Sequence, residues 1–179
     1  MITEKMAKAV SAQINLEFES AYLYLALAAE AEALGFPGAG GWLRIQAQEE
    51  LTHAMKFLTY MHDRNAKPEF PPVKCACSEV RTLLDLYQMV LAHEIMITTA
   101  IGKLADVAAA EHEYTLTPIL NWFLTEQIQE ESDAMKIVDK LKLAGNSGDA
   151  LLFLDRELGL RPAPAAAPQS AAADQAATN

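Results

Sequence analysis

The chain has 179 residues, of which 51% are apolar, and a formal net charge of −10 at neutral pH. This length is enough for one domain with a sizeable core. The negative charge argues against nucleic acid as a partner, because contacts with phosphate need Lys and Arg. No apolar run approaches the roughly 20 residues of a membrane span. Residues 1–5, Met-Ile-Thr-Glu-Lys, lack the apolar core of a secretory signal, so we expect a cytoplasmic protein.

Ala, Leu and Glu dominate over Val, Thr and Gly, which predicts an all-α protein. Amphipathic patterns place four long helices at about residues 3–34, 38–65, 78–109 and 115–144, and a short fifth helix at about 148–159. The hydroxyl of Ser78 can cap the third helix. Pro, Ala, Gln and Ser dominate residues 161–179, which predicts a disordered tail after a single domain of residues 1–160.

The connections between these helices predict their directions. Short links join the first helix to the second and the third to the fourth, so each pair forms an antiparallel hairpin. The link at about residues 66–77 is longer and contains Pro68, Pro71 and Pro72. Its roughly 12 residues reach about 37 Å when extended, against about 40 Å for a helix of 27 residues. This link can therefore run along the bundle and leave the second and third helices parallel.

Each long helix has an apolar stripe at i, i+3, i+4 and i+7 spacing that one carboxylate interrupts near mid-helix. The interrupting residues are Glu17, Glu50, Glu94 and Glu130. The fourth stripe, for example, contains Leu116, Leu120, Phe123, Gln127, Glu130, Ala134, Ile137 and Leu141. Because their depth in each helix is similar, the four carboxylates can meet at one level of a bundle.

Four ionised carboxylates in an apolar core are unfavourable unless a cation compensates them, and the stripes contain neither Lys nor Arg. A Glu-x-x-His pattern places Glu50 and His53 one turn apart, where both can bind one metal. A single Glu beside an apolar stripe is usually just solvated, and one Glu-x-x-His is weak evidence. Four interruptions at matching depth favour a site for two divalent cations.

The remaining metal-binding residue types give weaker signals. Cys75 and Cys77 are the only cysteines, and their C-x-C spacing matches neither zinc sites nor thioredoxin-like motifs. We interpret them as two reduced thiols in a loop, with metal capture or redox sensing as the alternative. His62, His93 and His112 lie outside the stripes, so we expect them at the surface or at subunit contacts.

Over nearly all of residues 1–160 this pattern resembles the ferritin family. The resemblance implies a ferritin-like four-helix bundle with a long crossover between helices two and three and a short fifth helix. Di-iron proteins of this family are themselves the source of the general bundle-site pattern, which has two Glu-x-x-His pairs. Here the fourth helix has Gln127-Ile128-Gln129-Glu130 instead, which resembles non-haem ferritins with an active ferroxidase centre. Leu51, where a bacterioferritin would have a haem-binding Met, argues against haem.

The resemblance also implies which residues bind iron. Glu17, Glu50 and His53 would hold the first iron, and Glu50 would bridge to a second iron held with Glu94 and Glu130. These two Fe²⁺/Fe³⁺ ions per subunit would form the ferroxidase centre.

Four further residues match weaker parts of the family's pattern. Gln127 would lie beside the irons without binding them, and Tyr24 would donate a hydrogen bond or an electron, although an ordinary core tyrosine is an equal alternative. Glu49 and Glu126 match a possible third iron site shared with Glu130. Gln129 stands where that site would have a carboxylate, which puts it in doubt.

By this resemblance the chain is expected to store and detoxify iron. It would be a ferroxidase that oxidises Fe²⁺ with O₂ or H₂O₂ and deposits ferric mineral inside a homo-oligomeric cage of 24 subunits. One alternative is a ferritin-like di-iron peroxidase that stores no mineral. The other is a purely structural bundle whose stability is indifferent to metal, which requires protonated or solvated core glutamates.

Overall fold

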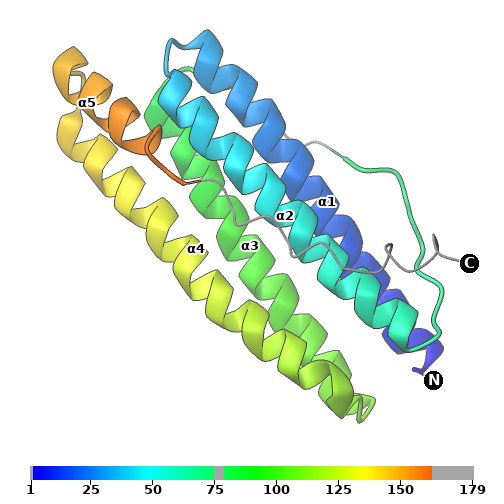
Figure 1. Ribbon diagram of the computed structural model, residues 1–179. Helices are drawn as coiled ribbons and strands as arrows, with labels where there is room; N and C mark the ends of the chain where they lie inside the picture. The colour runs from blue at the N-terminus through cyan, green and yellow to red at the C-terminus, as the bar shows by residue number, and fades with distance from the viewer. Residues whose placement is uncertain (1, 75–78, 163–179) are drawn as a thin grey trace, which may run out of the picture.

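The computed structural model describes residues 2–74 and 79–162. Within these residues the chain forms α1 (Glu4–Ala33), α2 (Pro37–Asp63), α3 (Leu83–Ala110), η1 (Tyr114–Leu116), α4 (Thr117–Ala144) and α5 (Gly148–Leu158). The four long helices lie side by side, and α5 packs at one end of them (Figure 1). This arrangement confirms the predicted four-helix bundle with a short fifth helix. No helix of the described part of the chain is long and apolar enough to span a membrane.

Helix α3 begins later than predicted. Its cap is Thr82, whose Oγ1 accepts a bond from the Asp85 backbone N–H at 3.1 Å, while Asp85 Oδ2 accepts one from the Thr82 N–H at 3.0 Å. This reciprocal pair satisfies two amides that would otherwise have no partner, so it sets the boundary. Residues 79–82 are not helical, and Ser78, the predicted cap, lies outside the described residues, as do Cys75 and Cys77.

The connection between α2 and α3 runs beside α1 for most of the bundle's length (Figure 1). The Glu69 backbone N–H donates to Ser11 Oγ at 3.1 Å, and the ring of Phe70 lies 6.4 Å from that of Phe18. Further along, the Lys74 N–H donates to a Glu19 carboxylate oxygen at 3.3 Å. The loop therefore returns the chain to the opposite end, and α2 and α3 are parallel, as the link length predicts.

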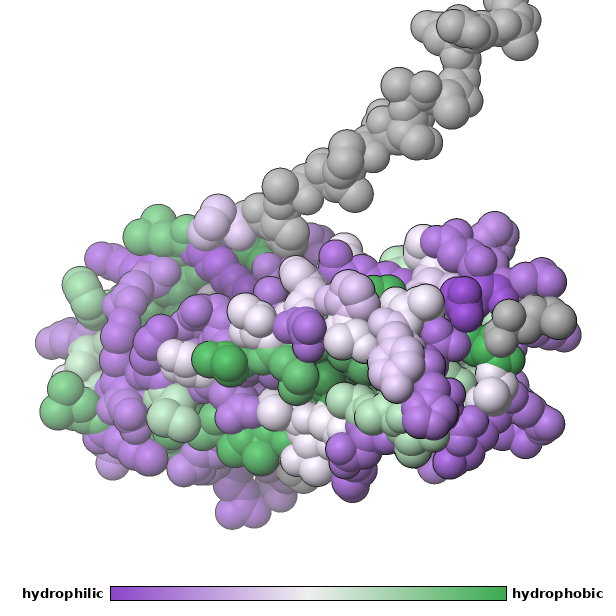
Figure 2. Space-filling model, turned by 90° about the horizontal axis from the view of Figure 1, so that it is seen from below, coloured by the Kyte–Doolittle hydropathy of each residue, from purple (hydrophilic) through white to green (hydrophobic). Residues whose placement is uncertain are grey.

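Two apolar clusters fill the bundle and leave a polar layer between them. One contains Tyr24, Leu43 and Tyr87, and the other contains Phe57 and Phe123. The predicted stripes are buried with one exception: on α4, Val138 is in the core and Ile137 is only partly buried. Positions 137 and 138 are both about one turn from Ala134, and Ile137 faces the end of α5 beside Leu158. The outside of the bundle retains apolar patches among polar regions (Figure 2).

Helix α5 is seated closely on the start of α2. Asp155 Oδ1 accepts a hydrogen bond from the Ala39 N–H at 2.8 Å, and the Leu158 side chain is buried. A Cβ atom at Gly38 would lie 1.9 Å from the Asp155 carbonyl oxygen, so only glycine allows this approach. Beyond Pro162 the predicted tail lies outside the described residues. These contacts fix the position of α5 against α2.

Candidate metal centre

The polar layer contains the four predicted carboxylates, one from each long helix. Glu17, Glu50, Glu94 and Glu130 are 0%, 2%, 1% and 8% exposed. Each lies near the middle of its helix, between the two apolar clusters. The helix directions differ, but the similar depth of each residue brings all four to one level of the bundle.

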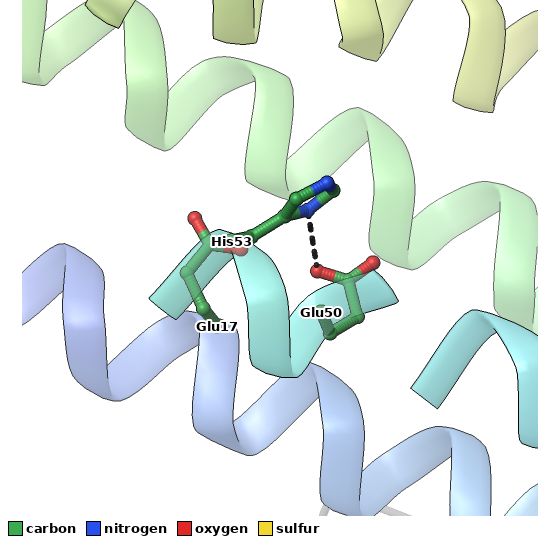
Figure 3. Close-up of side chains that lie close together, drawn as sticks. All are labelled: Glu17, Glu50 and His53. Carbon is green, nitrogen blue, oxygen red and sulfur yellow. Dashed lines mark hydrogen bonds and ion pairs between the residues drawn. The ribbon is translucent and has the colours of Figure 1, made fainter. Parts of the chain in front are cut away.

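Glu17, Glu50 and His53 form the compact half of this layer. One ligand atom from each lies within 4.8 Å of the others, and His53 Nδ1 is 3.2 Å from Glu50 Oε2 (Figure 3). Glu17 Oε1 accepts a bond from Gln13 Nε2 at 2.7 Å, but Glu17 Oε2 is buried without a hydrogen-bond partner among residues 2–74 and 79–162. An unsatisfied buried acceptor costs about 1–3 kcal/mol, and a cation bound by this oxygen would remove that cost.

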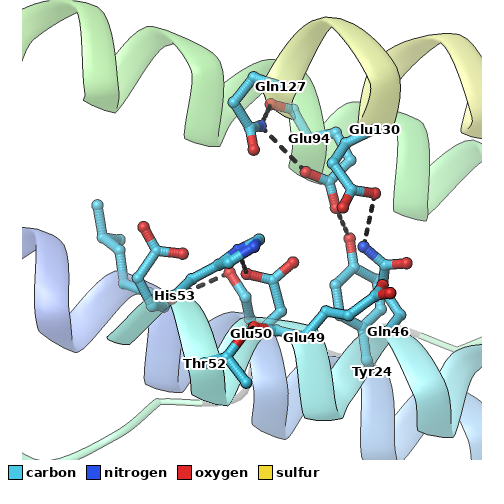
Figure 4. Close-up of polar contacts among 12 residues, drawn as sticks. Tyr24, Gln46, Glu49, Glu50, Thr52, His53, Glu94, Gln127 and Glu130 are labelled. Carbon is cyan, nitrogen blue, oxygen red and sulfur yellow. Dashed lines mark hydrogen bonds and ion pairs between the residues drawn. The ribbon is translucent and has the colours of Figure 1, made fainter. Parts of the chain in front are cut away.

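The other half consists of Glu94 and Glu130, which are not part of the three-residue group. Glu94 accepts hydrogen bonds from the Tyr24 hydroxyl and from Gln127 Nε2, the latter at 3.2 Å. Glu130 Oε2 accepts a bond from Gln46 Nε2 at 2.7 Å (Figure 4). Both carboxylates are therefore oriented by neutral donors, which leaves their charge uncompensated.

The electrostatics of the layer favour binding of a cation. Burial raises the pKa of Glu17 well above its usual range, and the neighbouring Glu50 raises it further. The pKa of Glu50 is likewise raised by burial first and then by repulsion from Glu94. Burial and then Glu94 raise the pKa of Glu130 to about 7. A divalent cation would stabilise the ionised forms and displace these protons.

Packing fixes the ring of His53. It meets the rings of Trp122 and Phe123 edge-on, with centroid distances of 5.4 Å to each. Phe123 in turn stacks on Phe57 at 4.3 Å. The imidazole is thus held between aromatic walls beside Glu50, so little conformational entropy remains to be lost when it binds a metal.

Two glutamines of this layer were missed by the sequence reasoning. Gln13 and Gln46 each lie one turn before a core glutamate on the same helix face, and both are buried. Gln127, which was predicted, lies in the same relation to Glu130 but donates to Glu94 on the neighbouring helix. A search for amides at i−4 or i−3 from each core Glu would have found all three.

His93, which was expected at the surface or at a subunit contact, is only partly exposed in the single chain. It lies in the seam between α1 and α3, where its Nε2 is 2.8 Å from Ser20 Oγ and its ring meets Tyr24 edge-on at 5.8 Å. Burial lowers its pKa to about 4. Position 93 is next to the stripe residue Glu94, and the close packing of α1 covers part of it. His62 and His112 are exposed.

The residues of the possible third site lie at the edge of the layer. Glu49 is partly buried, and Glu126 is close enough to raise its pKa, although burial is the larger cause. Gln129 is exposed, and Glu131 accepts a bond from Thr98 on α3. A residue that the sequence did not suggest, Arg161, forms an ion pair with Glu49. A metal ion at Glu49 would have to displace this guanidinium.

Comparison with known proteins gave consistent matches. A model of the ferritin-like domain family matches residues 7–144. The bacterial non-heme ferritin of Escherichia coli O6:H1 is 37% identical over 158 residues, which cover 88% of this chain and 96% of that protein. The bacterial non-heme ferritin of Bacteroides fragilis is 35% identical over 161 residues, or 90% of this chain and 100% of that protein.

Solved structures show the same likeness over the whole fold. A ferritin of Archaeoglobus fulgidus engineered into a closed form aligns with a TM-score of 0.89 and 40% identity, covering 92% of this chain and 100% of that one. The open-pore ferritin of the same archaeon aligns with a TM-score of 0.88 and 40% identity, covering 90% of this chain and 100% of that one.

Proposed function

We propose, from the premise that this chain belongs to the ferritin-like domain family, that it oxidises Fe²⁺ at the buried carboxylate layer and stores the ferric product. The observation that carries the proposal is the buried group of Glu17, Glu50 and His53, in which one oxygen of Glu17 has no hydrogen-bond partner in the part of the chain that the structure describes. Acidic residues are common on protein surfaces. A buried set without a counter-charge requires a cation to be stable in its ionised form.

In this proposal iron is the substrate. Glu17, Glu50 and His53 hold the first Fe²⁺, and the second is held by Glu94 and Glu130 with Glu50 as the bridge. The position of Glu50 supports the bridging role, because the charges of Glu94 and Glu130 are close enough to raise its pKa, after the larger effect of burial. Leu51, adjacent to Glu50, is 44% exposed and offers no ligand to haem iron.

Two Fe²⁺ ions give up one electron each, and O₂ accepts both electrons with two protons to form H₂O₂. With H₂O₂ as the oxidant, the same two electrons and two protons yield two water molecules. Oxygen donors favour the product, because hard carboxylates stabilise Fe³⁺ relative to Fe²⁺. A single imidazole leaves coordination positions open for the oxidant. Metal binding releases protons from the core carboxyl groups, and these protons are close enough to be used in the reduction of the oxidant.

Tyr24 and Gln127 support this centre without binding iron. Both donate hydrogen bonds to Glu94, one from α1 and one from α4, and so hold its carboxylate from two sides. A third iron at Glu49 and Glu126 would have to compete with the Arg161 guanidinium for the Glu49 carboxylate. Such an ion binds more weakly than the first two.

We further propose that identical subunits assemble into a cage of 24, inside which the mineral accumulates. Curated relatives are named non-heme ferritins, and one solved relative is an open-pore ferritin. Exposed apolar residues outside the core also support assembly, since Tyr22 and Leu25 on α1 and Phe153 on α5 are each at least half exposed. Figure 2 shows such apolar patches on one face of the single chain.

The test is an anaerobic Fe²⁺ titration of the metal-free protein followed by admission of O₂. We expect saturation at about two irons per chain and fast oxidation, both lost in Glu50→Ala. Glu30→Ala, an exposed glutamate of α1, is the matched control and behaves like the wild type. Soluble iron far above two per chain establishes storage, whereas turnover without accumulation favours the peroxidase alternative. Oxidation that survives Glu50→Ala rejects the proposal.

A further inference from the structure

Arg161 reaches back from the end of α5 to the polar face of α2. Its Nη1–H donates to Gln46 Oε1 at 2.7 Å, and its Nη2 pairs with the Glu49 carboxylate. The guanidinium also lies over the ring of Trp42, 4.4 Å from the centroid. Three contacts from three residues of one helix fix the guanidinium in place, which is more than an isolated surface ion pair provides.

The contact with Gln46 determines which way this buried amide points. A guanidinium can only donate hydrogen bonds, so the carbonyl oxygen of Gln46 must face Arg161. The NH₂ group must then face the opposite way, where it donates to Glu130 Oε2 at 2.7 Å. Gln46 is completely buried and 8% of Glu130 is exposed, so water offers little competition for this chain of bonds.

The position of Arg161 depends on the seat of α5 on α2. The Asp155 carboxylate binds the Ala39 N–H, and the close approach at Gly38 leaves little freedom for α5 to slide. The Arg161 backbone N–H also donates to the Leu158 carbonyl at 3.2 Å, so a backbone hydrogen bond ties Arg161 to the last residue of α5. The end of the fifth helix is therefore mechanically connected to a carboxylate of the centre.

We propose that Arg161 is a positioning residue for iron oxidation, which acts through Gln46 to hold Glu130 in place for the second iron. The inference rests on the proposed function, because it assigns Arg161 to the same centre. Without the guanidinium the Gln46 amide is free to turn, and Glu130 loses its only donor in the described part of the chain. Binding of the second iron then includes the cost of ordering both side chains.

The kinetic test uses initial rates of Fe²⁺ oxidation at fixed O₂. We expect Arg161→Gln to raise the KM for Fe²⁺ about tenfold, as losses of such supporting contacts do, while kcat changes by less than about twofold. Arg161→Lys keeps the positive charge but not the planar fork that spans Gln46 and Glu49, so it recovers only part of the loss. Arg156→Gln removes the same charge from an exposed position on α5 and leaves KM unchanged.

A second pair of variants separates the relay, by which we mean the hydrogen bonds from Arg161 to Gln46 and from Gln46 to Glu130, from a general effect of charge. In a Gln46→Leu background the relay is already broken, so Arg161→Gln should raise KM no further. Equal KM values for wild type and Arg161→Gln overturn the inference, as does a full effect of Arg161→Gln in the Gln46→Leu background. The proposed function fails in a different way, namely if the wild type shows no fast oxidation that depends on Glu50.

A structural readout tests the inference without iron. In crystals of the metal-free Arg161→Gln variant, we expect the Gln46 amide to turn away from Glu130, whereas Arg156→Gln retains the bond. If Gln46 still donates to Glu130 in the Arg161→Gln variant, the guanidinium does not orient this amide and the inference is wrong.

Discussion

The hydroxyl of Tyr24 on α1 donates a hydrogen bond to the carboxylate of Glu94 on α3, across the polar layer of the bundle. Tyr24 is completely buried, and burial raises its pKa well above the usual range, with the charge of Glu94 as the next cause. The phenol therefore keeps its proton and acts as a donor. This bond joins two helices at the level of the candidate metal centre.

Replacement of Tyr24 by Phe should slow iron oxidation without changing iron stoichiometry. Glu94 keeps its contact with Gln127 but loses the phenol, so its carboxylate is less well ordered for the second iron. We expect stopped-flow measurements to show an initial rate lower by about tenfold. Tyr87→Phe is the matched control, because the Tyr87 hydroxyl is buried with no hydrogen-bond partner among the described residues, and its removal should leave the rate unchanged. Equal rates in the two variants would mean that Tyr24 is an ordinary core residue with no role in iron oxidation.

Metal binding should stabilise the protein through Glu17. A cation would provide a partner for Glu17 Oε2, which accepts no hydrogen bond from any described residue. Zn²⁺ at a hundred times its Kd should add about 2.7 kcal/mol to the free energy of unfolding, measured as an increase in Tm by calorimetry. Glu17→Gln should lose most of this increase, and the exposed control Glu30→Gln should retain it. A Tm indifferent to Zn²⁺ would instead favour a purely structural bundle.

Without metal, the protein should become less stable as the pH rises from about 5 to 8. The folded chain raises the pKa of Glu130 from 4.5 to about 7, so between these values the folded state binds more protons than the unfolded state. The contribution of Glu130 to the free energy of unfolding is then complete below pH 4.5, the pKa of the unfolded state. It declines by roughly 3 kcal/mol per chain as the pH rises through this window. Glu17 and Glu50 act in the same direction. Chemical denaturation at a series of pH values measures the decline.

The Glu130→Gln variant is the control for this pH effect. It removes the titrating carboxyl group but preserves the size of the side chain, so the decline should become shallower. A stability that rises with pH over the same window would mean that the core carboxyl groups are ionised in the metal-free protein.

Glu49→Gln should leave the first two metal ions of each chain unaffected. Glu49 already has a cation in the Arg161 guanidinium, and it lies outside the group formed by Glu17, Glu50 and His53. Anaerobic calorimetric titration should therefore show two tight Fe²⁺ ions in both proteins, with only a weaker additional ion lost in the variant. A tight ion lost in Glu49→Gln but retained in Arg161→Gln would place Glu49 among the primary ligands.

The periodicity of the sequence was sufficient to predict the bundle and the carboxylate layer. Glu17, Glu50, Glu94 and Glu130 each interrupt an apolar stripe at mid-helix, and a side chain on the buried face of a helix can only point into the core. The Pro-rich link likewise predicted parallel α2 and α3 from its length alone. The start of α3 was placed too early, because the reciprocal capping by Thr82 and Asp85 decides a boundary that hydrophobic pattern does not mark.

The sequence by itself therefore determined the fold and the residues that face the core, because helix periodicity fixes the direction of each side chain relative to its own helix. Only the tertiary structure decided which of these residues meet across helices. Tyr24 donates a hydrogen bond to Glu94, 70 positions away in the sequence, and Arg161 donates one to Gln46, 115 positions away. Such contacts depend on the rotation of the helices and on the seat of α5, which result from packing of the whole core and leave no local signal in the sequence.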